Sequence, residues 1–200
     1  MTESAVTRNR RRTAAQITRS AQRLAEERGL DGFTMDDLAE VAGVSRRTLF
    51  NYVEGKFDAV LGAPAAPDPA RLVEFSHGGP TGRLHDDLKA VFTALLDTRD
   101  APADELDRTR RLIASDARLH KAMHDKFARS ADLLASALVE RDPGRFDAYR
   151  AKAAATVTLS LFDVALEGFV ADPGTGLADH FVAAFDGAAA LFGSTSSPGE

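Results

Sequence analysis

Residues 34–53, Thr-Met-Asp-Asp-Leu-Ala-Glu-Val-Ala-Gly-Val-Ser-Arg-Arg-Thr-Leu-Phe-Asn-Tyr-Val, contain two short helical patterns separated by a glycine. Thr34 and Ser45 each stand where an N-cap residue begins a helix. Gly43 permits a tight turn between the two helices. Three apolar residues can close a small core around this turn: Val44, Leu49 and Val53. The stretch therefore predicts a helix-turn-helix, a unit whose second helix enters the major groove of DNA.

The second helix of this unit has an outward face that suits base recognition. If Leu49 and Val53 point inward, a rotation of about 100° per residue points Arg47 and Asn51 furthest outward. Arginine can bind guanine edges and asparagine can bind adenine edges in the major groove. We expect the DNA-contacting surface to comprise Arg12, Thr34, Ser45, Arg46, Arg47, Thr48, Phe50, Asn51, Tyr52 and Lys56. The alternative is a small helical hairpin whose arginines are only solvated.

Charge is distributed unevenly along the 200-residue chain. The net charge of -5 excludes a uniformly basic nucleic-acid binder. Arginines nevertheless gather near the N-terminus, at Arg8, Arg10, Arg11, Arg12, Arg19, Arg23 and Arg28. A basic front end on an acidic body suggests a polyanionic partner. We expect residues 1–12 to form a flexible basic arm, which either follows a narrow minor groove of DNA or serves as a solubilising tail.

Several functional classes find no support in the sequence. The absence of Cys excludes disulfides, thiol catalysis and Cys-ligated zinc. No phosphate-binding loop, nucleophile elbow or zinc-protease motif is present, so we expect no enzyme and no cofactor. Asp116, His120 and His124 have a spacing that could hold a divalent metal, although a solvated helix face explains it better. With no secretory signal and no stretch approaching about 18 apolar residues, we expect a cytoplasmic protein without membrane contact.

The remainder of the chain has the periodicity of helices only. β-Branched residues are sparse and no run alternates at period two, so we predict an all-α fold of about nine helices. Residues 62–82 hold half of the chain's eight prolines and therefore interrupt the helices as a Pro/Gly-rich connector. Within the connector, residues 69–76 can form a short helix, because Asp68-Pro69 looks like an N-cap followed by a first-turn proline.

Six short blocks within residues 13–61 carry a more specific signal: residues 25–29, 33–35, 38–39, 42–45, 48–52 and Lys56. In this order and at this spacing they resemble the N-terminal domain of the TetR (tetracycline-repressor-like) family of transcriptional regulators. The resemblance implies a three-helix DNA-binding domain, a fourth connecting helix and a helical ligand-binding and dimerisation domain. It also implies repression that a small molecule relieves.

Two features depart from the family pattern. Glu54 places an acid near Lys56, the expected phosphate contact. Gly62 and Pro64 follow the fourth helix quickly, so the usual lever between ligand and DNA is in doubt. The resemblance sets the domains as a helix-turn-helix domain over 13–61, the connector over 62–82, a ligand-binding and dimerisation domain over 83–193 and a disordered tail over 194–200.

The two most apolar helical patterns, 145–170 and 177–192, suit a symmetric contact between two copies. The expected dimerisation residues are Leu161, Leu166, Phe181, Phe185 and Phe192. The expected ligand-binding residues are Phe92, Leu96, Leu112, Met123, Phe127, Leu159, Phe162 and Asp163. The alternatives are a monomer with one large core, and plain core packing in place of a pocket. Asp163 and Glu167 either anchor a cationic ligand or mark an exposed edge, whereas Arg110 or Arg111 would suit an acidic or acyl-thioester ligand.

The leading hypothesis is a ligand-responsive transcriptional regulator that binds a pseudo-palindromic operator as a dimer. Its expected partners are double-stranded operator DNA, a second copy of the chain and a small, largely apolar effector that releases the DNA. The first alternative is a helical small-molecule-binding protein without specific DNA binding. The second is a general DNA-binding protein that takes no ligand.

Overall fold

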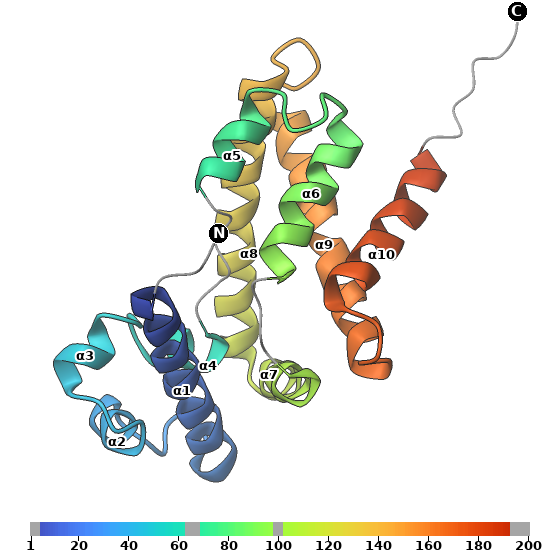
Figure 1. Ribbon diagram of the computed structural model, residues 1–200. Helices are drawn as coiled ribbons and strands as arrows, with labels where there is room; N and C mark the ends of the chain where they lie inside the picture. Colours follow the sequence, from blue (N-terminus) through green and yellow to red (C-terminus); the bar gives the residue numbers. More distant parts are fainter. Residues whose placement is uncertain (1–4, 63–68, 98–101, 193–200) are drawn as a thin grey trace, which may run out of the picture. The chain divides into compact units, whose positions relative to one another are not determined.

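The computed structural model describes residues 5–62, 69–97 and 102–192, except for the side chains of residues 5–7, 97 and 192. These residues form ten helices and no strand, which confirms the all-α class (Figure 1). The helices are α1 (Ala5–Arg28), α2 (Met35–Val41), α3 (Arg46–Phe50), α4 (Lys56–Leu61), α5 (Pro69–Ser76), α6 (Leu84–Asp97), α7 (Ala103–Ser115), α8 (Ala117–Arg141), α9 (Ala148–Ala171) and α10 (Leu177–Phe192).

The chain divides into two compact units. Unit 1 combines the chain up to residue 64 with residues 104–126, and unit 2 holds residues 65–103 and 127–200. The expected domain division was therefore wrong in one respect, because residues 104–126 belong with the helix-turn-helix rather than with the C-terminal helices. The expected tail, 194–200, lies outside the described residues.

Unit 1 has a core to which the late segment contributes. Ile17 and Leu24 of α1, together with Leu49 of α3, are at most 1% exposed. Leu112 of α7 and Leu119 of α8 join the same apolar cluster, at 8% and 1% exposure. Their burial removes apolar surface from water, and this explains why a segment distant in sequence completes the unit.

Helix α1 begins earlier than the sequence predicts. We expected a flexible arm up to residue 12 and a helix from Thr13, whereas α1 already begins at Ala5. Arginine and alanine are good helix formers, and no glycine or proline occurs within α1 to interrupt it. Because the later turns are anchored in the core of unit 1, the earlier turns extend a helix that is already nucleated.

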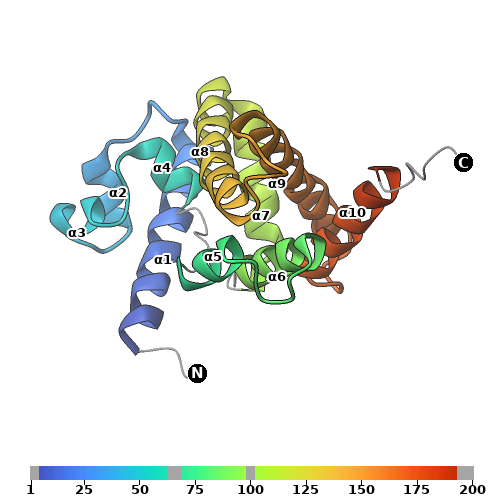
Figure 2. The ribbon, with the colours of Figure 1, turned by 90° about the horizontal axis from the view of Figure 1, so that it is seen from above.

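In unit 2, helix α10 packs against both α6 and α9; Figure 2 shows α9 and α10 side by side, as Figure 1 does. The ring of Phe181 is fully buried and stacks on Phe92 at 4.8 Å between centroids. A buried ion pair, Arg141 with Asp87, joins the C-terminal end of α8 to α6. The short helix expected at 69–76 is present as α5, which begins at Pro69.

Candidate nucleic-acid interface

Side-chain caps fix where both helices of the helix-turn-helix begin. The Thr34 hydroxyl accepts from the backbone N–H of Asp37 at 3.1 Å, and the Asp37 carboxylate accepts from the backbone N–H of Thr34 at 2.7 Å. Hydrogen bonds from the hydroxyl and backbone of Thr34 hold the pKa of Asp37 below its usual value. Ser45 Oγ accepts from the backbone N–H of Thr48 at 3.0 Å and caps α3. These caps set the angle at which α3 leaves the turn.

The turn between α2 and α3 depends on a glycine and on a bond from α1. Gly43 has a φ of 65°, in the left-handed region that disfavours side chains. Gln16 Nε2 donates to the backbone oxygen of Ala42 at 2.8 Å and so joins α1 to the turn. Leu49 and Val53, at 0% and 5% exposure, face inward as the periodicity predicts.

The opposite face of α3 carries the residues expected to read bases. Arg47 and Asn51 are exposed, and within the described parts of the chain neither side chain is hydrogen-bonded to the protein. Phe50 is 46% exposed beside them. Helix α3 is shorter than the expected 46–53, because Asn51 is already its C-cap. Asn51 keeps helical dihedrals, φ -78° and ψ -11°, so its side chain continues the outer face of the helix.

Two cations expected at the DNA surface are held by the protein itself. Arg46 Nη1 donates to both carboxylate oxygens of Asp36, at 2.8 and 2.9 Å, and its guanidinium lies 5.7 Å above the ring of Phe50. Lys56 Nζ donates to the backbone oxygen of Leu30 at 2.9 Å and lies 4.9 Å above the ring of Phe33. Lys56 thus joins α4 to the loop after α1, and the structure pairs it with Leu30 rather than with the neighbouring acid Glu54.

The side-chain oxygens of Thr34, Ser45 and Thr48 also have partners within the protein. Those of Thr34 and Ser45 serve as the caps described above, and the hydroxyl of Thr48 lies 2.8 Å from that of Ser45. Sequence reasoning did not single out Arg10, whose guanidinium lies 5.8 Å above the ring of Tyr52. Arg12, which it did select, is exposed on α1 and donates to Asn9 Oδ1 at 3.5 Å. The run of arginines was the visible signal, but only the helical form of residues 5–12 brings Arg10 to Tyr52.

Residues 104–126 hold the helix-turn-helix at several points. Gln22 Nε2 donates to the backbone oxygen of Val60 at 3.0 Å and to Thr109 Oγ1 at 2.8 Å, which links α1, α4 and α7. Arg118 of α8 donates to Asp31 Oδ1 at 2.9 Å. Hydrogen bonds to Asp116 and Asp31 raise the pKa of Arg118 and lower the pKa of both carboxyls.

The three side chains whose spacing could hold a metal ion, Asp116, His120 and His124, have other surroundings in the structure. The Asp116 carboxylate accepts from Nη2 of Arg118 at 2.9 Å, and His120 and His124 are exposed on α8. Within the described ranges, no group of three His, Asp or Glu side chains is arranged to hold a metal ion. The trio therefore fits the solvated helix face that the spacing also allowed.

The expected ligand-binding residues are divided between the two units. Leu112 is buried in the core of unit 1, and Met123 also belongs to unit 1. Phe92 stacks on Phe181 inside unit 2, where Leu96 is also buried. Four remain: Phe127 and Phe162, whose ring centroids lie 6.1 Å apart, half-buried Leu159 and exposed Asp163. The position of Asp163 fits an exposed edge rather than a cavity wall.

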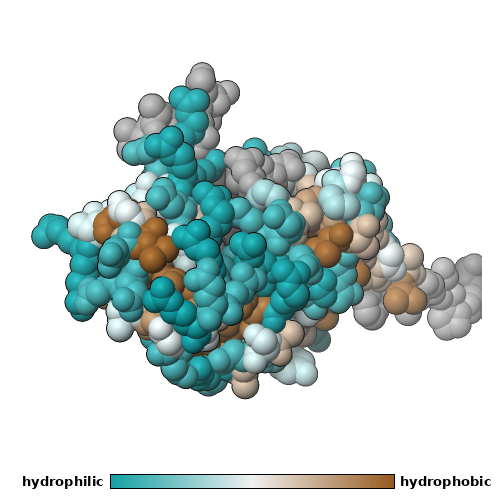
Figure 3. Space-filling view, turned by 90° about the horizontal axis from the view of Figure 1, so that it is seen from below, coloured by the Kyte–Doolittle hydropathy of each residue, from teal (hydrophilic) through white to brown (hydrophobic). Residues whose placement is uncertain are grey.

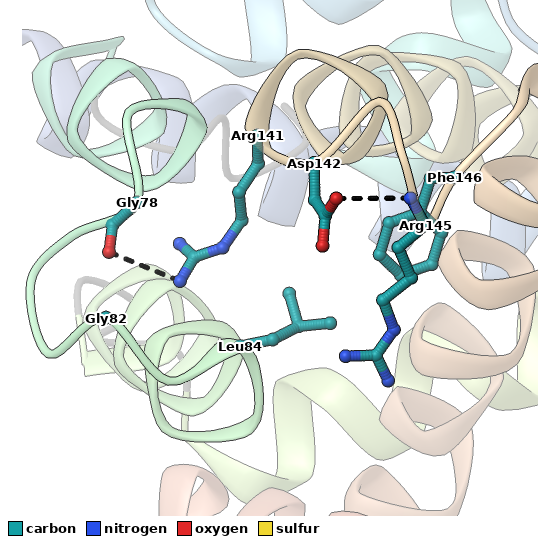
Figure 4. A pocket seen from close by; sticks show the side chains of 7 residues that line it. All are labelled: Gly78, Gly82, Leu84, Arg141, Asp142, Arg145 and Phe146. Carbon is teal, nitrogen blue, oxygen red and sulfur yellow. Dashed lines mark hydrogen bonds between the residues drawn. The ribbon is translucent and has the colours of Figure 1, made fainter.

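A pocket of about 260 Å³ in unit 2 lies elsewhere, at the C-terminal end of α8 (Figure 4). It is lined by Gly78, Gly82, Leu84, Arg141, Asp142, Arg145 and Phe146. Figure 4 shows the guanidinium of Arg141 turned toward the Gly78 loop, where Nη2 donates to the Gly78 oxygen at 3.3 Å. None of the expected ligand-binding residues lines this pocket.

The expected dimerisation residues are mostly core residues of a single chain. Phe181 is 0% exposed, while Phe185 and Leu166 are 8% exposed. Leu161 is half-buried, and the side chain of Phe192 lies outside the described residues. The aromatic side of α10 packs inward, where the ring of Phe181 stacks on Phe92 of α6. The large hydrophobic side chains that stay exposed on the described parts of these two helices are Tyr149, Val157, Val164 and Leu191, at 84%, 49%, 55% and 78%.

Helix α9 is more apolar than the sequence analysis suggested. Its 24 residues have the length and composition of a membrane-spanning helix, with a mean hydropathy of 1.5 over the most apolar stretch. The expectation that no stretch reaches this level was wrong. Asp163 nevertheless lies near the middle, where it would cost about 2.5–3.5 kcal/mol in a bilayer. A helix with one face in a core and another against a second subunit has the same composition.

Comparisons with known proteins agree with this geometry. Residues 17–57 match the family model described as bacterial regulatory proteins, tetR family. No curated protein sequence matches the chain. Thermus thermophilus FadR, a TetR-family transcriptional repressor solved in complex with lauroyl-CoA, is 22% identical, with a TM-score of 0.53 over 94% of this chain and 98% of that one.

The crystal structure described as a putative TetR-family transcriptional regulator from Mesorhizobium loti MAFF303099 has the same coverage, 20% identity and a TM-score of 0.51. These likenesses extend the shared fold beyond the matched segment to nearly the whole chain. Residues 17–57 of this chain therefore match the tetR family of bacterial regulatory proteins, and the chain has the fold of TetR-family transcriptional regulators.

Proposed function

We propose that this protein is a repressor that binds a pseudo-palindromic operator as a dimer and releases it when a small, largely apolar molecule binds. The observation that carries the proposal is the outer face of α3. Arg47 and Asn51 are exposed there, opposite the inward Leu49 and Val53, and neither side chain is hydrogen-bonded to another described residue. A bidentate guanidinium and a side-chain amide are the groups that distinguish guanine and adenine in the major groove.

Dimerisation is proposed on the apolar residues left exposed on α9 and α10. Val157 and Val164 lie on one stripe of α9, and Leu191 lies on α10. Small residues, Ala183 and Gly187, are exposed on α10 and would let a second pair of helices approach closely. A symmetric pair would place two recognition helices about 34–36 Å apart, one turn of DNA, on a pseudo-palindrome.

The effector proposal rests on Phe127 and Phe162 of unit 2. Both rings are half-buried, with centroids 6.1 Å apart, so an apolar chain can replace part of their mutual contact. The Thermus protein binds lauroyl-CoA; an acyl chain on a polar head is therefore the ligand class that we propose first. A coupling of about 1–3 kcal/mol between effector and DNA would suffice for regulation.

The test is selection of preferred sequences from a random pool of DNA duplexes by the full-length protein. Arg47→Ala should lose about 1–3 kcal/mol on the selected sequence and much less on mixed-sequence DNA. Arg46→Ala is the matched control, because Arg46 is already paired with Asp36; it should change both affinities alike. If no sequence is enriched, the alternative of a small-molecule-binding protein without specific DNA binding replaces this proposal.

A further inference from the structure

The first turns of α1 project beyond the core of unit 1. The first buried residue of α1 is Ile17, and the match to the tetR family also begins at residue 17. We call residues 5–16 the N-terminal extension. Residues 8–12 within it are exposed, and Figure 3 shows this projecting end of α1 as hydrophilic. Residues 8–12 are therefore not part of the apolar core of unit 1.

The charge of the extension is not explained by helix stability. Arg8, Arg10, Arg11 and Arg12 lie near the N-terminal end of α1, and no acid precedes Glu26 in this helix. The helix dipole makes that end positive, so cations there are unfavourable and acids would be favoured. An arginine cluster in this position instead adds to the positive potential of the helix end and attracts a polyanion.

One arginine of the extension is tied to the recognition helix. The guanidinium of Arg10 lies 5.8 Å above the ring of Tyr52, which directly follows the C-cap of α3, Asn51. A cation over an aromatic face uses none of its N–H donors. Arg10 is exposed, so its donors can bind an acceptor outside the protein while the ring holds the side chain in place.

We propose that the N-terminal extension is a second DNA-contacting surface, in which Arg10, positioned by Tyr52, binds a phosphate group beside the groove that α3 enters. Arg8 and Arg12 lie one turn apart on the other side of the same helix end and add to its positive potential. An α-helix is about 10–12 Å wide with its side chains, whereas the minor groove is about 6 Å wide. The helical form therefore excludes the minor-groove arm expected from the sequence and leaves the phosphate backbone as the target. Guanidinium groups bind phosphate oxygens in pairs.

The phosphate-binding surface of the extension rests on the proposed function in one respect, that duplex DNA is the partner. Its test measures binding of the full-length protein to a mixed-sequence DNA duplex across a range of NaCl concentrations. Each phosphate contact contributes about 0.9 to the slope of log affinity against log salt. Arg10→Ala should lower the slope by about 1, and R8A/R10A/R12A by at least as much, with at least about tenfold weaker binding of the triple variant at moderate salt.

Arg23→Ala is the matched control, because Arg23 is an exposed arginine of the same helix about 20 Å from Arg10. It should leave the slope unchanged. A double-mutant cycle tests whether Tyr52 positions Arg10. Arg10→Ala should weaken DNA binding less in the Tyr52→Ala background than in the Tyr52→Phe background, because phenylalanine keeps the ring. Additive effects would refute the positioning.

The two proposals fail separately. An unchanged salt slope in R8A/R10A/R12A, with α1 intact by circular dichroism, overturns the phosphate surface even if an operator is found. The extension would then be the solubilising tail. If the slope falls as expected but the wild-type protein enriches no sequence, the phosphate surface stands and the sequence-specific regulator fails.

Discussion

Lys126 of α8 forms an ion pair with Asp58 of α4 at 2.5 Å, and the two side chains are only 11% and 27% exposed. Lys126 also donates to the backbone oxygen of Gly62 at 2.7 Å, directly after the end of α4. The Asp58 carboxylate in turn accepts from the backbone N–H of Glu54 at 3.1 Å. The short fourth helix is thus held at both ends by polar contacts, and one residue of α8 connects them.

We predict that Lys126→Met lowers the free energy of unfolding of unit 1 by about 2–3 kcal/mol. The substitution leaves the Asp58 carboxylate half-desolvated with one fewer donor, and this costs more than an exposed pair is worth. Urea denaturation followed by circular dichroism measures the change. Lys121→Met is the control on the same helix, since the Lys121 to Asp125 pair is 76% and 47% exposed. It should cost less than about 0.5 kcal/mol; equal losses would contradict a special role for Lys126.

The capped turn of the helix-turn-helix could be predicted from the sequence because its determinants are local. Thr34 and Ser45 bond to residues three positions later, and the inward side of α3 follows from a fixed rotation per residue. The same locality explains the match with the family segment 17–57. Exposure of Arg47 and Asn51 follows directly from burial of Leu49.

Contacts between distant segments could not be predicted in this way. Leu112 has an ordinary helical pattern, and nothing nearby in the sequence indicates that it joins the same apolar cluster as Ile17 and Leu24 of α1. Phe181 has the periodicity of an interface residue, but its burial depends on Phe92, 89 positions earlier. An apolar helix face predicts that something covers it, whereas only the tertiary arrangement decides whether that cover is the same chain or a second copy.

A buried carboxylate in unit 2 should make stability depend on acid pH. Asp87 is fully buried and accepts from the hydroxyl and backbone N–H of Thr81, both at 2.7 Å, and from Arg141 Nη2 at 2.5 Å. Burial acts to raise the pKa of Asp87, but the bonds from Thr81 and Arg141 outweigh it and lower the pKa below its usual value. A lowered folded-state pKa stabilises the fold above the unfolded value near 4, and this stability is lost as pH falls through the folded value.

We predict that Asp87→Asn lowers the free energy of unfolding at pH 7 by about 3–5 kcal/mol, because Arg141 stays buried without its counter-ion. The variant should also lose less stability than the wild type when the pH is lowered from 7 to 3. Asp86→Asn is the neighbouring control: its partner Arg83 is 78% exposed and Asp86 itself 29%, against 7% and 0% for Arg141 and Asp87, so the cost should stay below about 1 kcal/mol. Equal acid sensitivity in wild type and Asp87→Asn would assign the pH dependence to other carboxyls.

The pair between Arg46 and Asp36 should limit binding to DNA. Asp36→Asn frees the Arg46 guanidinium and removes a negative charge from the first turn of α2. We expect about three- to tenfold tighter binding to mixed-sequence duplex and a salt slope larger by about 1. Both side chains are 64% exposed, so stability should change by less than about 1 kcal/mol. Glu40→Gln removes an exposed acid from the same helix without freeing an arginine; if it tightens binding equally, net charge alone explains the gain.

The last prediction concerns the surface between two copies of the chain. Val164→Glu should convert the dimer to a monomer, because a symmetric contact on α9 would bring the new carboxylate close to its own mate and to Asp163 and Glu167 of the second copy. Light scattering measures the mass. Leu133→Glu is the matched control: Leu133 is 59% exposed on α8, away from the proposed contact, and its variant should remain dimeric.

Phe181→Ala completes this test, because it shows what a substitution in the core of one chain does, in contrast to one at the contact between two chains. Phe181 is fully buried within one chain, so its truncation should lower the free energy of unfolding by about 3–5 kcal/mol. Val164→Glu should instead leave the unfolding of the monomer unchanged, since the side chain is 55% exposed. A wild-type protein that is monomeric at micromolar concentration, or a Val164→Glu variant that stays dimeric while Leu133→Glu dissociates, would move the contact away from α9.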